Sequence, residues 1–374
     1  MDISFKIDPE VLIGADTLSM AGTVASRHGS RMMIAADQSI DSLTVNRLKG
    51  ILEDSGLDAI VFDGIDESSS VEMADNIVEL TCAGHCDAII GFGSLKTQII
   101  ARMAAIMTPM RITAFELLDG RIFHNKFLPL ISIPTEGMSA FSMTDYFIAV
   151  DPRQRLLKPV QSPGNLYSAV IIDSNLYKFL SGTAAASFVI ESFFTAVEAY
   201  CSTRANFLSD ALLERAVSLY AKLLKGGVTA NAETFAQANF LSALGSSVSS
   251  PGIGAALAAA INARVPVPKS LCSAVLFPCL AEKFVSAKPE KMARLASLLG
   301  AGKAATVAES AAASISAIRR TMADLNLPAN LKDRNIPLDN LTAAAEAARS
   351  LDLTANSPWT VSEEEVFKIL KEIL

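Results

Sequence analysis

One helical segment carries polar side chains whose spacing can support chemistry. The stretch "TAAASFVIESFFTAVEAYCS", residues 183–202, is small, apolar and aromatic, lacks Gly and Pro, and is long enough for a core helix. Glu191, Thr195 and Glu198 follow one another at i, i+4 and i+7, which places them on one face of that helix. Because a carboxylate among apolar neighbours is costly to ionise alone, this face predicts a polar site and a partner for Glu191.

A second candidate site is the turn "GFGS", residues 91–94, which follows a buried strand and opens a helix. Backbone N–H groups at such a helix start favour a phosphate, and Ser94 can donate a further hydrogen bond. A tight strand-to-helix turn needs the same residues, so both interpretations stay open. Asp37, which ends the strand "RMMIAAD", can accept hydrogen bonds from an adenosine ribose and repel a 2′-phosphate, or it can cap the next helix.

The motif "CAGHC" contains residue types that bind metals: Cys82, His85 and Cys86. A fourth ligand at a recognisable spacing is missing. We therefore interpret the motif as the end of a helix that feeds an apolar strand, in which Cys acts as a small hydrophobic residue. The five cysteines are scattered along the chain, so we expect no disulfide framework.

The pattern of apolar residues changes near residue 177. Before it, β-branched and aliphatic runs alternate with helical stretches, which predicts a parallel α/β sheet covered on both faces. The expected strands are 31–37, 58–65, 86–94, 128–135, 146–150 and 168–173, and the expected helices are 42–56, 71–83 and 95–106. After about residue 178 the chain is rich in Ala and Leu with helical periodicity. We predict an α/β domain over 1–177 and an all-helical domain over 178–374.

Composition limits the class of protein. A chain of 374 residues usually forms two domains. Its net charge of −7, without a basic patch interleaved with aromatics, argues against a nucleic-acid partner. Its apolar runs stay shorter than the roughly 20 residues of a membrane span, and its first residues lack the order of a signal peptide. We expect a cytoplasmic protein with no membrane partner.

The whole chain resembles the iron-containing (group III) alcohol dehydrogenases, whose fold is that of dehydroquinate synthase. The resemblance is carried, in the family's order and spacing, by "LIGADTLSMAGTVASRHGSRMMIAAD", "GLDAIVFDGIDESSS", "CDAIIGFGS", "PLISIPT", "SAVIIDS", "FTAVEAYCS" and "ANSPWTVSEEEVFKIL". It implies a Rossmann-like dinucleotide-binding domain, a helical domain, and an active site in the cleft between them. Family members are commonly dimers, so it also implies a homodimer.

The resemblance implies that the family's metal ligands, one Asp and three His, are replaced here. Glu191 and Thr195 stand at the first two positions, and Ala255 and Lys269 at the other two. The chain's only histidines lie in its N-terminal half: His28, His85 and His124. One carboxylate and one hydroxyl do not make an iron or zinc site, so we expect no metal.

Lys269 is the most informative of these replacements. Its ammonium can occupy the place of the metal cation, with Glu191 as its counter-ion. Next to a substrate carbonyl it can polarise the bond and donate a proton as a hydride arrives, and burial, which lowers a lysine pKa, would help. The alternatives are a purely structural salt bridge and a lysine that reaches solvent at the edge of the cleft. Glu198 has a family counterpart that is also Glu, and we expect it in a structural hydrogen-bond network.

The cofactor site implied by the resemblance has also changed. The family's "GGGSviDtAK" reads "GFGSLKTQII" here, so that its Asp and Lys become Thr97 and Ile100 and its middle Gly becomes Phe92. A Phe obstructs a close backbone approach to phosphates unless it points away. The residues that remain to bind a dinucleotide are Gly14, Asp37, Gly91, Gly93, Ser94, Thr135, Gly137 and Ser139. This set predicts NAD, with NADP possible.

The sequence therefore predicts an NAD(P)-dependent oxidoreductase that acts on a small alcohol or aldehyde without a metal. Lys269, Glu191 and Thr195 are the predicted catalytic residues. The alternative is a non-catalytic member of the fold, kept to bind a nucleotide or a partner protein. A lyase similar to dehydroquinate synthase is a poorer third interpretation, since its Glu ligand suits Glu191 but its metal-binding histidines are absent.

Overall fold

The computed structural model describes residues 5–66, 68–121, 127–162, 166–179, 182–226, 231–302, 304–334 and 336–374. Contacts divide the chain into two compact units. The first unit contains residues 1–154 and 158–178, and the second contains residues 155–157 and 179–374.

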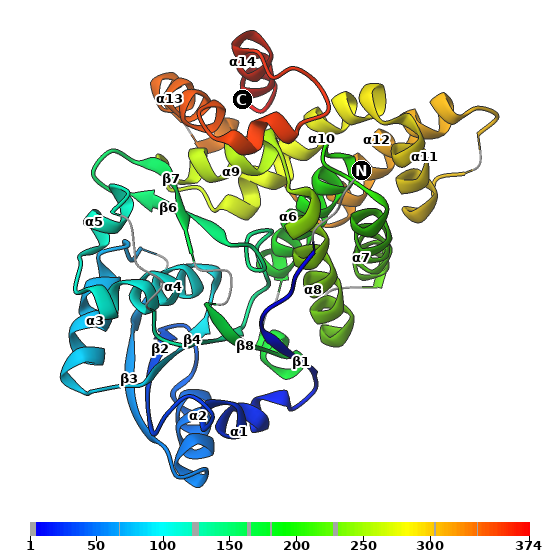
Figure 1. Ribbon diagram of the computed structural model, residues 1–374. Helices are drawn as coiled ribbons and strands as arrows, with labels where there is room; N and C mark the ends of the chain where they lie inside the picture. Colours follow the sequence, from blue (N-terminus) through cyan, green and yellow to red (C-terminus); the bar gives the residue numbers. More distant parts are fainter. Residues whose placement is uncertain are drawn as a thin grey trace. The chain divides into compact units, whose positions relative to one another are not determined.

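The first unit is built on a six-stranded sheet in the order β1-β8-β5-β4-β2-β3 (Figure 1). The strands are β1 (Glu10–Gly14), β2 (Arg31–Asp37), β3 (Asp58–Ile65), β4 (Ala88–Gly93), β5 (Leu130–Pro134) and β8 (Tyr167–Asp173). Every neighbouring pair is parallel. Two further strands, β6 (Tyr146–Asp151) and β7 (Leu156–Gln161), form a separate two-stranded sheet.

The strand order reverses between β2 and β4. From β2 the chain moves outward to β3 and then returns to place β4 on the other side of β2. In open parallel sheets, ligands bind outside the carboxyl ends of the strands at such a switch point. The two chain segments at this place are the end of β2, with Asp37, and the end of β4, with Gly93.

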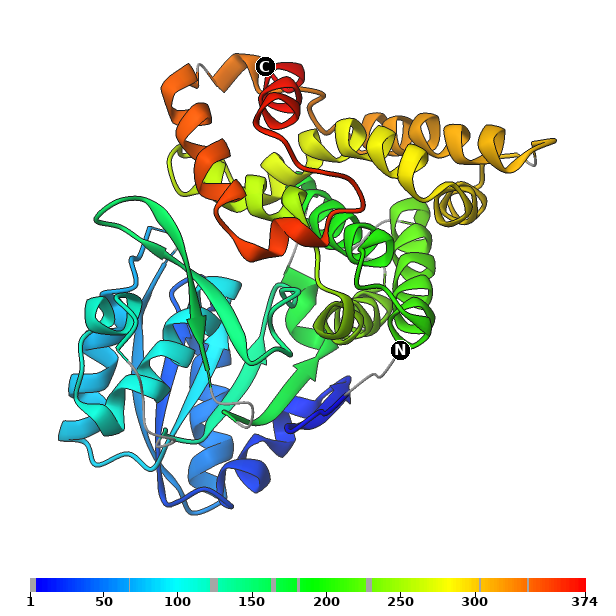
Figure 2. The same ribbon diagram turned by 45° about the horizontal axis from the view of Figure 1, so that its top comes forward.

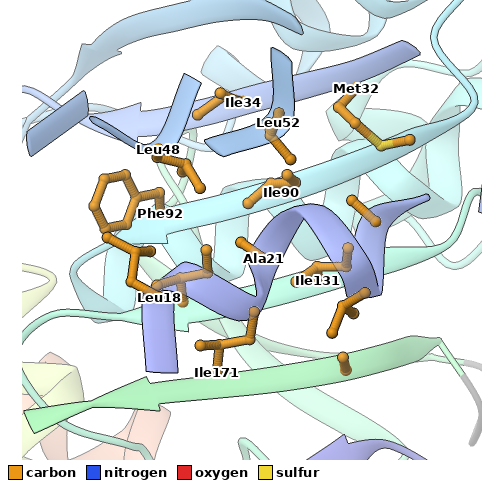
Figure 3. Close-up of a cluster of buried hydrophobic side chains, with 14 of the residues drawn as sticks. Leu18, Ala21, Met32, Ile34, Leu48, Leu52, Ile90, Phe92, Ile131 and Ile171 are labelled. Atoms are coloured by element: carbon orange, nitrogen blue, oxygen red, sulfur yellow. The ribbon is translucent and has the colours of Figure 1, made fainter. Parts of the chain in front are cut away.

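Helices cover both faces of this sheet. They are α1 (Ala21–Ala25), α2 (Ser42–Asp54), α3 (Met73–Ala83), α4 (Leu95–Met110) and α5 (Ala114–Leu118), with short 3₁₀ turns at Thr17–Met20 and Ser174–Phe179. Figure 3 shows one face, where Leu18, Leu48 and Leu52 from the α1–α2 side pack on strand residues such as Ile90 and Ile131. Strand side chains alternate between faces, and the opposite face packs on α3 and α4.

The described part of residues 179–374 is helical (Figure 2). Its α-helices are α6 (Gly182–Cys201), α7 (Phe207–Gly226), α8 (Ala232–Ser249), α9 (Ile253–Asn262), α10 (Lys269–Ala287), α11 (Pro289–Leu298), α12 (Val307–Asp324), α13 (Leu338–Arg349) and α14 (Glu363–Glu372), joined by 3₁₀ turns at Lys332–Arg334 and Asp352–Asn356. Helix α6 contacts α7, α8, α9 and α10. Its Phe194 stacks on Phe277 of α10, with ring centroids 4.7 Å apart.

Helix α10 is the one described helix that is by itself long and apolar enough to cross a membrane, and α8 with α9 would pass together but for a bend of 112°. More than half of the apolar stretch of α10 is buried inside the protein, as in a helix of a packed core.

The prediction of a parallel α/β sheet followed by helices is confirmed. The strands expected over 31–37 and 58–65 have those bounds.

Candidate functional site

The carboxylate of Asp37 is fully engaged at the carboxyl end of β2. Its Oδ1 accepts hydrogen bonds from the backbone N and the Oγ of Ser39, at 2.9 and 2.7 Å. Its Oδ2 accepts from Ser94 Oγ at 2.5 Å and from Thr97 Oγ1 at 3.0 Å. Burial raises the pKa of Asp37, but these hydrogen bonds outweigh it and hold the pKa below its usual value. The N-cap of α2 is Asp41, so the interpretation of Asp37 as a helix cap is wrong.

The glycines of the turn allow close packing. Gly93 has φ +150°, and a Cβ there would lie 2.5 Å from the Cβ of Asp37. A Cβ on Gly91 would lie 2.9 Å from that of Ala101 on α4. Phe92 is completely buried and points into the core beside Leu18 and Leu48 (Figure 3), so it does not obstruct the turn.

We predict that Gly93→Ala destabilises the protein by about 2 to 4 kcal/mol. The alanine would have to adopt a positive φ that non-glycine residues disfavour, and its Cβ would clash with Asp37. Gly50→Ala is the control: Gly50 lies inside α2 with nothing within 4 Å of an added Cβ, so this change should leave stability equal or raise it. Urea unfolding of both variants measures the difference. Equal midpoints for the two variants would contradict the packing argument.

Helix α4 begins at Ser94, its N-cap, whose hydroxyl accepts a long hydrogen bond from the backbone N of Thr97, at 3.4 Å. Thr97 and Ile100, at the positions of the family's Asp and Lys, are buried. Sequence reasoning missed Gln98, which is buried and whose Nε2 donates to the carbonyls of Gly91 and Gly93 at 2.9 and 3.3 Å. These contacts bind the start of α4 to β4, and the one sequence signal for Gln98 is a polar side chain on a buried helix face.

The other predicted cofactor residues lie on segments that leave the same sheet. The backbone N of Thr135 donates to the carbonyl of Gly93 at 3.1 Å, so Thr135 adjoins the turn. Gly137 and Ser139 follow in the same segment, and Ser139 Oγ accepts from the backbone N of Phe141. Gly14 ends β1 with φ +151°, three strand spacings or about 14 Å from β4. The structure thus gathers most of this set near Gly93 and leaves Gly14 further along the edge.

In the helical unit, Lys269 at the start of α10 forms an ion pair with Glu191 of α6. The Lys269 Nζ to Glu191 Oε1 distance is 2.7 Å, and the side chains are 30% and 15% exposed. The predicted pairing of these two residues is confirmed. Thr195 Oγ1 donates to the backbone carbonyl of Glu191 at 2.8 Å, one turn earlier on the same helix.

These residues do not fit a divalent metal. Glu191 meets an ammonium, Thr195 offers a hydroxyl already donated within its helix, and Ala255 has no ligand atom. Among the residues that the structure describes, no group of three or more His, Cys, Asp or Glu side chains could hold a metal ion. His124 lies outside the described residues.

The "CAGHC" segment fits the packing interpretation. Cys82 lies in the last turn of α3, and Cys86 is buried just before β4. Burial raises the pKa of the Cys86 thiol to about 11, which disfavours the thiolate that a metal would need.

Glu198 is a buried residue of α6, about one turn beyond Thr195. Its carboxylate lies at the N-terminus of α9. Its Oε1 accepts from the backbone N of Gly254 at 2.6 Å, and its Oε2 accepts from the backbone N of Ala255 at 3.0 Å. The expected structural hydrogen-bond network is confirmed. Burial raises the pKa of Glu198 to about 7, against the lowering effect of these hydrogen bonds and of the Lys269 charge.

The chain is similar over nearly its whole length to several curated enzymes. The 1,3-propanediol dehydrogenase of Citrobacter freundii is 23% identical, with 92% of this chain and 91% of that protein aligned. The lactaldehyde reductase of Escherichia coli (strain K12) is 20% identical, with 94% of each protein aligned. The sulfoacetaldehyde reductase of Bilophila wadsworthia is 23% identical, with 94% of this chain and 93% of that protein aligned. By name these relatives are oxidoreductases.

Solved structures have the same fold. A 1,3-propanediol oxidoreductase superposes with a TM-score of 0.92 at 21% identity, over 100% of both chains. The sulfoacetaldehyde reductase from Bifidobacterium kashiwanohense, solved in complex with NAD⁺, gives a TM-score of 0.87 at 17% identity, over 100% of this chain and 99% of the other.

Family models match both halves of the sequence. Residues 8–174 match the model described as iron-containing alcohol dehydrogenase, and residues 185–374 match that of the Fe-containing alcohol dehydrogenase family, C-terminal. The chain therefore belongs to the iron-containing alcohol dehydrogenase family, a family of oxidoreductases.

Proposed function

We propose that this protein is a metal-independent, NAD(P)-dependent oxidoreductase that interconverts a small aldehyde and its alcohol. The observation that carries the proposal is the ion pair of Lys269 with Glu191, 2.7 Å apart, at two of the positions where the family resemblance implies metal ligands. An ammonium there supplies a positive charge without a metal. We further propose that the protein acts in the cytoplasm as a homodimer, with a small molecule as its partner and neither nucleic acid nor membrane.

The chemistry assigned to Lys269 is that of an electrophile and general acid. A reduced nicotinamide, when bound, would supply the hydride for the carbonyl carbon. The Lys269 ammonium donates a hydrogen bond to the carbonyl oxygen, and transfers a proton to that oxygen as negative charge develops on it. The resulting amine regains a proton from solvent, which its 30% exposed side chain can contact. Oxidation of the alcohol reverses each transfer.

Glu191 and Thr195 support this role. The Glu191 carboxylate fixes the direction of the ammonium through the ion pair, since the Glu191 side chain is itself only 15% exposed. Thr195 is one turn away on the same face of α6. We propose that it lines the site beside the ion pair.

The turn at the end of β4 fits the pyrophosphate of a dinucleotide. It lies at the switch point of a parallel sheet, its Gly93 has no side chain, and the 16-residue helix α4 begins directly after it. The N-terminal N–H groups of a helix and its dipole favour a bound anion. We propose that Gly91, Gly93, Ser94 and Thr135 form the pyrophosphate side of the site.

We expect protein treated with a chelator, and verified free of iron and zinc, to bind NADH or NADPH saturably. Cofactor fluorescence during titration measures this binding, and consumption of NAD(P)H with a panel of short aldehydes measures turnover. Added zinc or ferrous iron should change neither.

Activity that disappears with the metal and returns with it would overturn metal independence. If neither cofactor binds, with or without metal, the dehydrogenase assignment fails. The chain is then better described as the non-catalytic member of the fold that the sequence left as the alternative.

A further inference from the structure

The carboxylate of Asp37 has no accessible acceptor position left for a ligand. A carboxylate offers about four lone-pair sites. Ser39 fills those of Oδ1 with a backbone N–H and a hydroxyl, and Ser94 and Thr97 fill those of Oδ2 with two hydroxyls. The backbone N of Ser94 makes a further, long hydrogen bond to Oδ2, at 3.4 Å. The residue is only 5% exposed. A ribose diol that approached this carboxylate would have to displace one of these internal donors.

The donors of Asp37 come from the cofactor turn itself. Ser94 is the N-cap of α4, and Thr97 lies in the first turn of that helix. Their hydroxyls meet on one oxygen of a residue that belongs to a different strand, β2, at 2.5 and 3.0 Å. Gly93 permits this approach, because a Cβ there would collide with Asp37. The carboxylate therefore links the end of β2 to the start of α4.

The hydroxyl of Ser94 is not free to donate to a phosphate. A hydroxyl has one proton to donate, and that of Ser94 is donated to Asp37. The backbone N of Ser94 is also directed at Asp37 Oδ2, at 3.4 Å. A phosphate would therefore contact other backbone N–H groups at the start of α4, and their direction depends on how that start is held.

We infer that Asp37 is a positioning residue that clamps the pyrophosphate turn through Ser94 and Thr97, and that it does not select NAD over NADP by binding the ribose. This inference rests on the proposed binding of a dinucleotide. The side chains that follow Asp37 at this edge, Gln38 and Ser39, are exposed and uncharged, and can hydrogen-bond either a hydroxyl or a phosphate. The protein is therefore expected to bind NADH and NADPH with dissociation constants within about tenfold of each other.

The test compares three variants by fluorescence titration with NADH and NADPH. Thr97→Val keeps the shape and removes one donor of the clamp, whereas Thr97→Ser keeps the hydroxyl. We expect Thr97→Val to weaken both cofactors by the same factor, about three- to tenfold, and Thr97→Ser to restore wild-type binding. Asp37→Asn should weaken both cofactors with an unchanged ratio. An Asp37→Asn protein that binds NADPH tenfold better relative to NADH than wild type does would overturn the inference.

Hydrogen exchange separates this inference from the proposed function. If wild type binds neither cofactor, the proposed function fails, but the clamp still predicts faster amide exchange over residues 93–98 in Thr97→Val and Asp37→Asn, and wild-type exchange in Thr97→Ser. Unchanged exchange in Thr97→Val would contradict the clamp. Thermal unfolding of each variant verifies that it is folded.

Discussion

Replacing Lys269 with Met is expected to lower kcat for aldehyde reduction by about two to three orders of magnitude, with the Kd for NADH within about twofold of wild type. Met has a similar length but neither the charge nor the proton of the ammonium. Removing one donor that stabilises a developing oxyanion typically has an effect of about 10²–10³ in rate. Steady-state kinetics with the best aldehyde from the panel, and cofactor titration, provide the two measurements.

A matched control lies on the same helix. Lys283 of α10 forms an ion pair with Glu365 at 2.7 Å, and its side chain is 34% exposed, close to the 30% of Lys269. Lys283→Met therefore breaks an ion pair of the same length with a similarly exposed lysine, and should leave kcat within about twofold, since exposed pairs contribute little. Comparable losses in both variants would assign the effect to helix stability rather than to chemistry.

The double variant Glu191→Gln with Lys269→Met addresses the carboxylate that the single change leaves unpaired. If the loss of activity came from burying a lone charge on Glu191, the double variant would recover it. We expect no recovery, because the missing group is the proton donor. A Lys269→Met protein with wild-type kcat would contradict the proposed mechanism.

Much of the sheet could be predicted because its strands are short apolar runs ended by turn residues. The run over 58–65 and the helix start after Ser94 are local features that depend on a few neighbouring residues. The strand β7 was missed, because "LLKPVQ" contains Lys158 and Pro159 and so lacks a continuous apolar pattern. It forms only with β6, outside the main sheet.

The residues of the candidate sites could be predicted from the sequence, but only some of the contacts between them could. Family resemblance brought Glu191 and Lys269 together, although 77 positions separate them in the chain, because it supplied their alignment to one site. The clamp on Asp37 depends on strand register. Ala36 pairs with Phe92, which sets Asp37 against the turn after β4, and a single sequence does not specify that register.

Replacing Glu198 with Ala is expected to destabilise the helical unit by about 3 kcal/mol or more. The change leaves the backbone N–H of Gly254, which is buried, and that of Ala255, which is partly buried, without acceptors, at a cost of about 1–3 kcal/mol for a buried group, and it opens a cavity. Glu198→Gln keeps the volume and one acceptor and should have a smaller effect. Urea unfolding, followed by the fluorescence of the single Trp, Trp359 in the same unit, measures both.

The exposed carboxylate of Glu309 provides the control for this change. Its Oε2 accepts from the backbone N of Ala305 and Thr306, both at 3.1 Å, in the capping box of α12. Water can replace it there, so Glu309→Gln should have a much smaller effect than Glu198→Ala.

The same carboxylate makes stability depend on pH. The pKa of Glu198 rises from its ordinary 4.5 to about 7 on folding, so the folded state holds this proton when the unfolded state has released it. Stability is therefore highest below about pH 4.5 for this group and falls as pH rises towards 7, by on the order of 3 kcal/mol in total. We expect wild type to lose stability between pH 5 and pH 8 and Glu198→Gln to lose less, because an amide does not titrate. A Glu198→Gln protein with the wild-type pH dependence would assign the titration to another group.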